Sequence, residues 1–113
     1  MKINVLGMEY EIIKTDKNKE KRLEKNWGFV DYNTKQIYID TDILVETDDS
    51  CKNLKYFENK VIRHEIIHAF LYESGLRENS FDVRGWAENE EMVDWFAIQS
   101  PKIFKIYQEL NIL

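Results

Sequence analysis

The sequence predicts an α+β fold in a single domain over residues 1–113. Apolar residues alternate in short β-prone runs up to about residue 40, and from about residue 54 they recur with the period of helices. Of the 113 residues, 43% are hydrophobic and 33% charged, a composition typical of one folded domain and not of a disordered chain. We therefore expect a small N-terminal antiparallel or mixed β-sheet, packed on a buried helix that is followed by two further helices.

The first half of the chain predicts strands. Residues 2–14 carry regularly placed apolar side chains and predict one or two short strands. The stretch 16–26 is almost entirely polar and predicts a solvated loop or a short surface helix. Two β-prone runs, 29–32 and 36–39, flank a polar turn at 33–35 and together predict a β-hairpin.

A long helix is predicted from about Leu54 to Ser74. Its middle part, residues 61–72, is apolar on nearly all sides, which is typical of a helix buried in the centre of a domain. Asp48-Asp49-Ser50 are residue types that cap helix N-termini. Gly75 is expected just past the C-terminal end, in the left-handed conformation that glycine favours there.

The C-terminal part predicts a loop at 76–85 and a helix over about 86–99. A further helix is expected to start at Ser100-Pro101, because serine caps N-termini and proline suits the first helical position. Four apolar residues of that last helix are expected to face inward: Ile103, Ile106, Tyr107 and Leu110. The three tryptophans are expected in the core: Trp27, Trp86 and Trp95.

Composition and charge exclude several classes of function. The net charge of −5 argues against a sequence-independent nucleic-acid binder. No apolar run is long enough for a signal peptide or a membrane span, so the cytoplasm is the expected location and no membrane partner is expected. The single cysteine, Cys51, cannot form an internal disulfide and is interpreted as a plain thiol, with occupancy of a metal's fourth position as the alternative. The pattern predicts no oligomeric state.

Both histidines of the chain lie in the predicted long helix, in the run His64-Glu65-Ile66-Ile67-His68. Residues i and i+4 share one face of a helix, so both imidazoles can reach one cation, and Zn²⁺ suits such ligands. Two histidines placed at random in this chain would stand four apart in about 2% of cases, so the spacing is informative. The alternative is that these are ordinary helix residues, which requires burying two imidazoles and a carboxylate without a partner.

A catalytic zinc site needs a third protein ligand and an open position. The chain has no third histidine, so we expect a carboxylate from the following helix. Glu90 and Asp94 share a helical face, which favours Glu90 as the ligand and Asp94 as the acceptor that orients a ligand histidine. Glu91 is the first alternative, followed by Asp82 or Glu88. Without a metal, these residues would be an acidic helix start that favours the helix dipole.

Together these segments resemble a zinc metallopeptidase of the gluzincin type, and more closely the ImmA/IrrE type in a small phage or prophage variant. The similarity spans roughly residues 27–99. It is carried by Gly28-Phe29-Val30-Asp31 through Ile37-Tyr38-Ile39-Asp40, Arg63-His64-Glu65, and Glu90-x-x-x-Asp94-x-Phe96-Ala97. The resemblance implies a minimal zincin-like metallopeptidase domain with Zn²⁺ held by His64, His68 and Glu90. It also implies Glu65 as the general base and the strand 36–40 as the edge that pairs with a protein or peptide substrate.

If the site is catalytic, Glu65 takes the proton of a zinc-bound water and later returns it to the leaving amine. The oxyanion also needs a hydrogen-bond donor. Both histidines serve the metal, so Tyr72, four residues after His68, is the first candidate, although a role as a core aromatic of the helix is the favoured interpretation of this residue. The other candidates are Arg63, Tyr38 and Arg84. Two other functions stay open: a non-catalytic zinc-binding domain that serves structure or protein interaction, and an interaction protein without metal.

Overall fold

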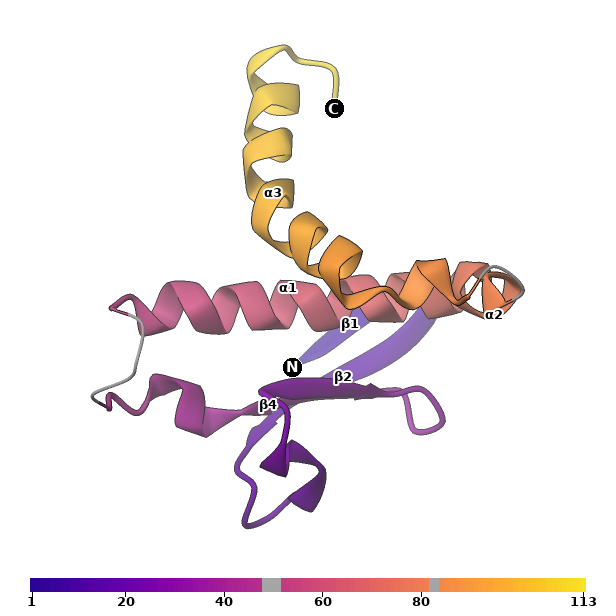
Figure 1. Ribbon diagram of the computed structural model, residues 1–113. Coiled ribbons are helices and arrows are strands. Elements are labelled where there is room, and N and C mark those ends of the chain that lie inside the picture. Colours follow the sequence, from indigo (N-terminus) through magenta and orange to yellow (C-terminus); the bar gives the residue numbers. More distant parts are fainter. Residues whose placement is uncertain (48–51, 82–83) are drawn as a thin grey trace.

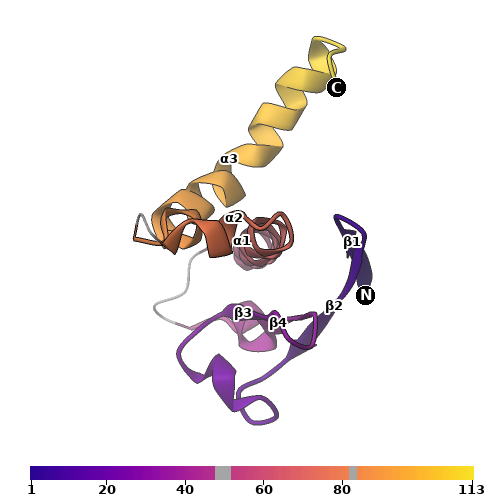
Figure 2. The ribbon, with the colours of Figure 1, turned by 90° about the vertical axis from the view of Figure 1, so that its right-hand side faces the viewer.

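The computed structural model describes residues 1–47, 52–81 and 84–113, which form an α+β fold. Within these residues a four-stranded mixed sheet lies against helix α1 (Leu54–Glu73), and helix α3 (Glu90–Glu109) lies on the other side of α1 (Figure 1, Figure 2). The predicted fold class is therefore confirmed. No helix in the described part of the chain has the length and apolar character needed to cross a membrane.

The sheet contains two antiparallel hairpins, of which the second was predicted as a hairpin and the first only as one or two short strands. The first joins β1 (Lys2–Val5) to β2 (Met8–Thr15), and the second joins β3 (Gly28–Asp31) to β4 (Gln36–Asp40). The strand order is β1-β2-β4-β3, and β2 and β4 are parallel. The implied role of residues 36–40 as a free edge is therefore wrong, because β4 lies inside the sheet, whose edge strands are β1 and β3.

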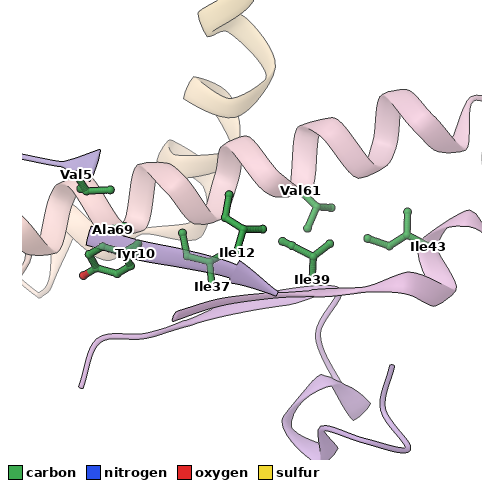
Figure 3. Close-up of a cluster of buried hydrophobic side chains, with 8 residues drawn as sticks. All are labelled: Val5, Tyr10, Ile12, Ile37, Ile39, Ile43, Val61 and Ala69. Carbon is green, nitrogen blue, oxygen red and sulfur yellow. The ribbon is translucent and has the colours of Figure 1, made fainter. Parts of the chain in front are cut away.

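The core lies between the sheet and α1 (Figure 3). It consists of eight buried side chains: Val5, Tyr10, Ile12, Ile37, Ile39, Ile43, Val61 and Ala69. Successive side chains of a strand point to opposite faces, so Ile37 and Ile39 of β4 both face α1. Each fully buried aliphatic side chain stabilises the fold by about 1.5–3 kcal/mol. This packing fixes α1, and with it both histidines, relative to the sheet.

The ends of α1 lie close to the predicted positions. The side-chain oxygen of Asn53 accepts a hydrogen bond of 3.0 Å from the backbone N–H of Tyr56 and caps the N-terminus. The predicted caps at 48–50 lie outside the described residues. Ser74 is the C-cap of α1. Gly75, the next residue, has φ = +82°, which confirms its predicted left-handed conformation.

Burial of α1 is confined to one side. The buried positions are Glu58, Val61, Glu65, His68 and Ala69. Phe70 is exposed, so the expectation of a helix buried on nearly all sides is wrong. The reason is that the sheet covers one face of α1, whereas α3 crosses the other face over only part of its length (Figure 1).

The segment between α1 and α3 is more ordered than the predicted loop. It contains the short helix α2 (Leu76–Asn79) and the 3₁₀ turn η4 (Trp86–Glu88). The polar stretch before β3 contains a similar turn, η1 (Lys21–Glu24), in line with the predicted short surface helix.

The two predicted C-terminal helices are one helix. Asn89 caps α3, its side-chain oxygen accepting a hydrogen bond of 2.9 Å from the backbone N–H of Met92. From Glu90 the helix continues through Pro101 to Glu109, so the predicted start of a new helix at Ser100 is wrong.

Large apolar side chains lie outside the core. Each of the three tryptophans is about half exposed, so their predicted place in the core is wrong. The second half of α3 projects from the rest of the molecule (Figure 1). For that reason Ile106, Tyr107 and Leu110 are exposed and do not face inward as predicted, and Ile103 is half-buried.

Candidate metal centre

His64 and His68 lie one turn apart on α1, and Glu90 meets them from the first turn of α3. Nε2 of His64 lies 2.9 Å from Oε2 of Glu90, and Nε2 of His68 lies 3.0 Å from Oε1 of the same carboxylate. The two Nε2 atoms are 3.2 Å apart. One ligand atom from each residue can be chosen so that all three lie within 4.8 Å of one another. The fold thus brings together the two histidines and the carboxylate that the sequence singled out.

This set of atoms fits a zinc ion. Ligand atoms in a tetrahedral zinc site lie ~2.0–2.1 Å from the ion and therefore roughly 3.4 Å from one another. The separations between His64, His68 and Glu90 are close to that value. Glu90 is 73% exposed, so the site is open to solvent on that side, as a catalytic zinc site must be.

Asp94 lies one turn after Glu90 and contacts the other nitrogen of His64. Its Oδ1 atom is 3.3 Å from Nδ1 of His64 and 3.3 Å from Nζ of Lys60. A proton on Nδ1 then leaves the lone pair of Nε2 directed at the site, which is the usual way an outer carboxylate orients a ligand histidine. The Nδ1 atom of His68 is buried and has no hydrogen-bond partner. Burial lowers the pKa of His68, and the negative charge of Glu90 only partly opposes this effect. The lowered pKa favours the neutral imidazole, which is the form that binds metals.

Glu65 is buried beside these ligands. Its side chain is 7% exposed, and it lines a pocket of about 200 Å³ together with His64, Glu90 and Asp94. Burial, reinforced by the negative charge of Glu90, raises the pKa of Glu65 to about 8. A cation near Glu65 would lower this pKa again, since an opposite charge favours the carboxylate. The pocket therefore contains a carboxyl group that can both accept and return a proton near neutral pH.

Gly28, the first residue of β3, allows the edge strand to approach Glu65. A Cβ atom at this position would lie 3.1 Å from Cγ of Glu65 and 3.0 Å from the carbonyl oxygen of Tyr38. Gly28 also lines the pocket that contains Glu65. The strand β3 and the side chain of Glu65 are thus so close at Gly28 that a larger residue there would require one of them to shift.

Tyr72, the first candidate for an oxyanion donor, is not among the residues that line this pocket. Its ring stacks on that of Tyr32 with centroids 4.3 Å apart, and Nζ of Lys35 lies 4.7 Å from the ring centroid. These contacts give Tyr72 a packing role between α1 and the β3–β4 hairpin.

The other proposed donors also have partners elsewhere or lie on the surface. The hydroxyl of Tyr38 donates to Oε1 of Gln36 at 2.9 Å, and Nε of Arg63 donates to the carbonyl oxygen of Ala97 at 2.6 Å. Arg84 is exposed. None of these three residues lines the pocket that contains Glu65.

The alternatives to Glu90 as a ligand are placed differently. Glu88 forms an ion pair of 3.0 Å with Arg77, and Glu91 is exposed and not part of the cluster. Asp82 and Cys51 lie outside the described residues. Among the described residues, Glu90 is therefore the carboxylate that meets both histidines.

Tyr32, which the sequence did not single out, does not line the pocket that contains Glu65 but lies with Tyr72 and Arg77 in a neighbouring one. It directly follows β3, and burial raises the pKa of Tyr32 to about 12, Arg77 opposing this rise and Glu65 and Glu90 adding to it. Its hydroxyl therefore stays protonated near neutral pH and can donate a hydrogen bond. The sequence position of Tyr32, directly after β3, indicates that it lies near the site only once β3 is known to be an edge strand.

Comparisons of the chain with models of protein families, with curated proteins and with solved structures give no match.

Proposed function

We propose that this protein is a zinc-dependent metallopeptidase with a minimal zincin-like fold that hydrolyses a peptide bond in a protein or peptide substrate. The observation that carries the proposal is the convergence of His64, His68 and Glu90 with the buried carboxyl group of Glu65 beside them. A structural zinc site needs ligands, but it needs neither an open side nor an additional acidic residue next to them. Both features favour hydrolysis over a non-catalytic zinc-binding role.

Each residue of the site has a distinct role in this proposal. His64, His68 and Glu90 would hold the zinc ion, and Asp94 orients the ring of His64. A zinc ion held there supplies a Lewis acid, which polarises a peptide carbonyl and makes water nucleophilic near neutral pH. Glu65 accepts the proton of the attacking water and gives it to the amine that leaves.

The edge strand β3 supports an extended peptide as the form of the substrate. Among the described strands β3 pairs with β4 alone, so its outer N–H and C=O groups can pair with an added strand. Because Gly28 of β3 lines the same pocket as Glu65 and His64, such a strand would pass that pocket.

Tyr32 is the proposed donor to the oxyanion. It follows the edge strand directly, and its hydroxyl is influenced by the charges of Glu65 and Glu90. The stacked ring of Tyr72 would then fix the orientation of Tyr32 without contacting the substrate.

Metal analysis combined with the variant Glu65→Gln tests the proposal. The wild type and E65Q are expected to contain about one zinc ion per chain, and E65Q is expected to lose activity on a quenched peptide library by about 10²–10⁴-fold. Glu91→Gln, an exposed position on the same turn as Glu90, is the matched control and should keep both zinc and activity. Absence of stoichiometric zinc would refute the metal site. Equal hydrolysis by zinc-loaded wild type and E65Q would leave only a structural role for the ion.

A further inference from the structure

An apolar stripe runs along one face of α3 for its whole length. Its members follow one another at intervals of three or four residues, which keeps them on one side of a helix: Met92, Phe96, Ser100, Phe104, Tyr107 and Leu110. Next to the metal centre the stripe points away from it, since Met92 is rotated by about 200° from Glu90 around the helix.

The first half of this stripe lines an apolar groove on the body of the molecule. The groove has a volume of about 350 Å³, and Phe96 and Ser100 form one of its walls. Phe70 of α1 and Leu6, in the turn between β1 and β2, lie on the other side, and both are exposed.

The second half of the stripe projects into solvent. Residues 101–113 leave the body of the molecule (Figure 1, Figure 2), and Phe104 and Tyr107 are 53% and 44% exposed. This segment nevertheless ends in a complete helix cap, in which Asn111 has φ = +54° and the backbone N–H of Ile112 donates to the carbonyl of Tyr107 at 3.1 Å. The sequence thus specifies where the projecting part of α3 ends.

The exposed area is large enough for a stable interface. The radius of gyration is 15.1 Å, against ~13 Å for a compact chain of this length. The accessible surface is 7962 Å², whereas a compact monomer of this mass exposes roughly 6,600 Å². The excess exceeds the ~800 Å² that each partner buries in a protein interface of standard size.

We propose that two copies of this chain form a two-fold symmetric dimer through antiparallel pairing of α3, centred on Ser100. In that arrangement Phe104 of each copy lies opposite Phe96 of the other, and each projecting segment covers the groove of its partner. The chain thereby provides both the groove and the helix that fills it, as an interface between identical surfaces requires. The small side chain of Ser100 allows the two helices to approach closely where they cross.

The dimer leaves the metal centre accessible. Glu90 and Asp94 lie about 120° and 160° around the helix from Phe96, so the pairing does not cover them. The inference therefore stands independently of the proposed peptidase activity.

Light scattering coupled to size-exclusion chromatography tests the dimer directly. The wild type is expected at twice the chain mass of 13.6 kDa. The double variant Phe104→Glu/Tyr107→Glu should raise the dissociation constant by about tenfold or more, because it charges the projecting half of the stripe. Lys105→Glu introduces a glutamate on the opposite face of the same segment and should leave the dimer intact. A wild type that is monomeric at all concentrations, or a dimer that the double variant leaves unchanged, would overturn the proposal.

Cross-linking locates the symmetry axis. In a Cys51→Ser background, Ser100→Cys should be joined rapidly to its counterpart by a short thiol-specific cross-linker, whereas Lys105→Cys should not. The reverse pattern, or equal cross-linking at both positions, would refute antiparallel pairing centred on Ser100 even if the chain is dimeric.

Discussion

Nε of Arg63 donates a hydrogen bond of 2.6 Å to the carbonyl oxygen of Ala97, the carbonyl that Pro101 leaves without its helical partner. In a continuous helix the carbonyl of residue 97 accepts from the N–H of residue 101, and proline has no N–H to donate. Arg63, from α1, takes its place. Arg63 is the residue before His64, and Ala97 lies about one turn after Asp94. This bond therefore joins α1 and α3 beside the metal centre.

The first prediction is that Arg63 and Pro101 are energetically coupled. Arg63→Met should lower the free energy of unfolding by on the order of 2 kcal/mol, since it leaves the carbonyl of Ala97 unpaired. In a Pro101→Ala background the restored N–H can pair with that carbonyl, so the same change should cost clearly less. A double-mutant cycle measured by urea denaturation checks this. Equal costs in both backgrounds would contradict it.

The second prediction concerns the pH dependence of stability at Glu58. This side chain of α1 is 1% exposed, and ammonium groups of Lys55 and Lys14 lie 2.6 Å and 3.3 Å from its Oε1 atom. The hydrogen bond from Lys55 in particular lowers the pKa of Glu58. Because the pKa of Glu58 is lower in the folded than in the unfolded chain, its ionisation stabilises the fold at pH values above the pKa of the unfolded chain. This contribution disappears as the pH falls through the pKa of the folded protein.

Glu58→Gln should therefore lower the free energy of unfolding by about 2 kcal/mol at pH 7 and have little effect near pH 3. Denaturation curves of both proteins over that range provide the measurement. A difference that persists unchanged into acid would show that packing, and not charge, is responsible.

The third prediction is the opposite behaviour at Glu65 in protein kept metal-free by a chelator. Its pKa is raised from 4.5 to about 8, so ionisation of Glu65 opposes folding as the pH rises between these values. Glu65→Gln should unfold like the wild type near pH 4 and be more stable at pH 9, by on the order of 3 kcal/mol. Thermal melts at the two pH values would reveal the difference. A variant less stable than the wild type at pH 9 would contradict the assigned burial.

The fourth prediction is that Asp94 affects zinc affinity without being a ligand. Asp94→Asn removes the negative charge 3.3 Å from Nδ1 of His64 and should weaken zinc binding by about 10–100-fold. Competition with a chromogenic chelator measures this. Glu91→Gln, which removes the same charge from an exposed position, should bind zinc like the wild type. Equal affinities of the two variants would remove Asp94 from the site.

The fifth prediction separates the two stacked tyrosines. Tyr32→Phe should reduce kcat by about 10²–10³-fold with little change in KM, because it removes the donor to the oxyanion and keeps the ring. Tyr72→Phe keeps the stack as well and should retain most of the activity. Steady-state kinetics on one peptide substrate compares both variants. A larger loss in Tyr72→Phe would assign the donor to Tyr72.

The part of the site that lies within one helix could be predicted from the sequence. The i, i+4 spacing of His64 and His68 places both imidazoles on one face whatever else the chain does. Glu90 and Asp94 could also be placed on a common face, and the structure brings this face to the histidines. That second step depends on how α1 and α3 cross, which no local pattern determines.

The predictions of a new helix at Ser100 and of a free edge at 36–40 are wrong because both features depend on interactions between distant segments. The sequence around Pro101 predicts the start of a new helix. The hydrogen bond from Arg63 to Ala97, which lets the helix continue, comes from a distant segment and cannot be predicted from the local sequence. The interior position of β4 depends on its parallel pairing with β2, so the edge strand could not be assigned from either hairpin alone. The position of Tyr32, the proposed oxyanion donor, depends on the same strand order.

The side of β3 that no described strand pairs with also creates a hazard, since the backbone groups that would bind an extended peptide can pair equally well with an unfolded chain. An open strand next to exposed Trp27 is a starting point for aggregation. The strand is only four residues long, and it ends at Asp31, which forms an ion pair of 2.7 Å with Arg22. Short length and charge at its end limit further pairing, so the chain keeps its edge open to one partner strand without offering a template for many.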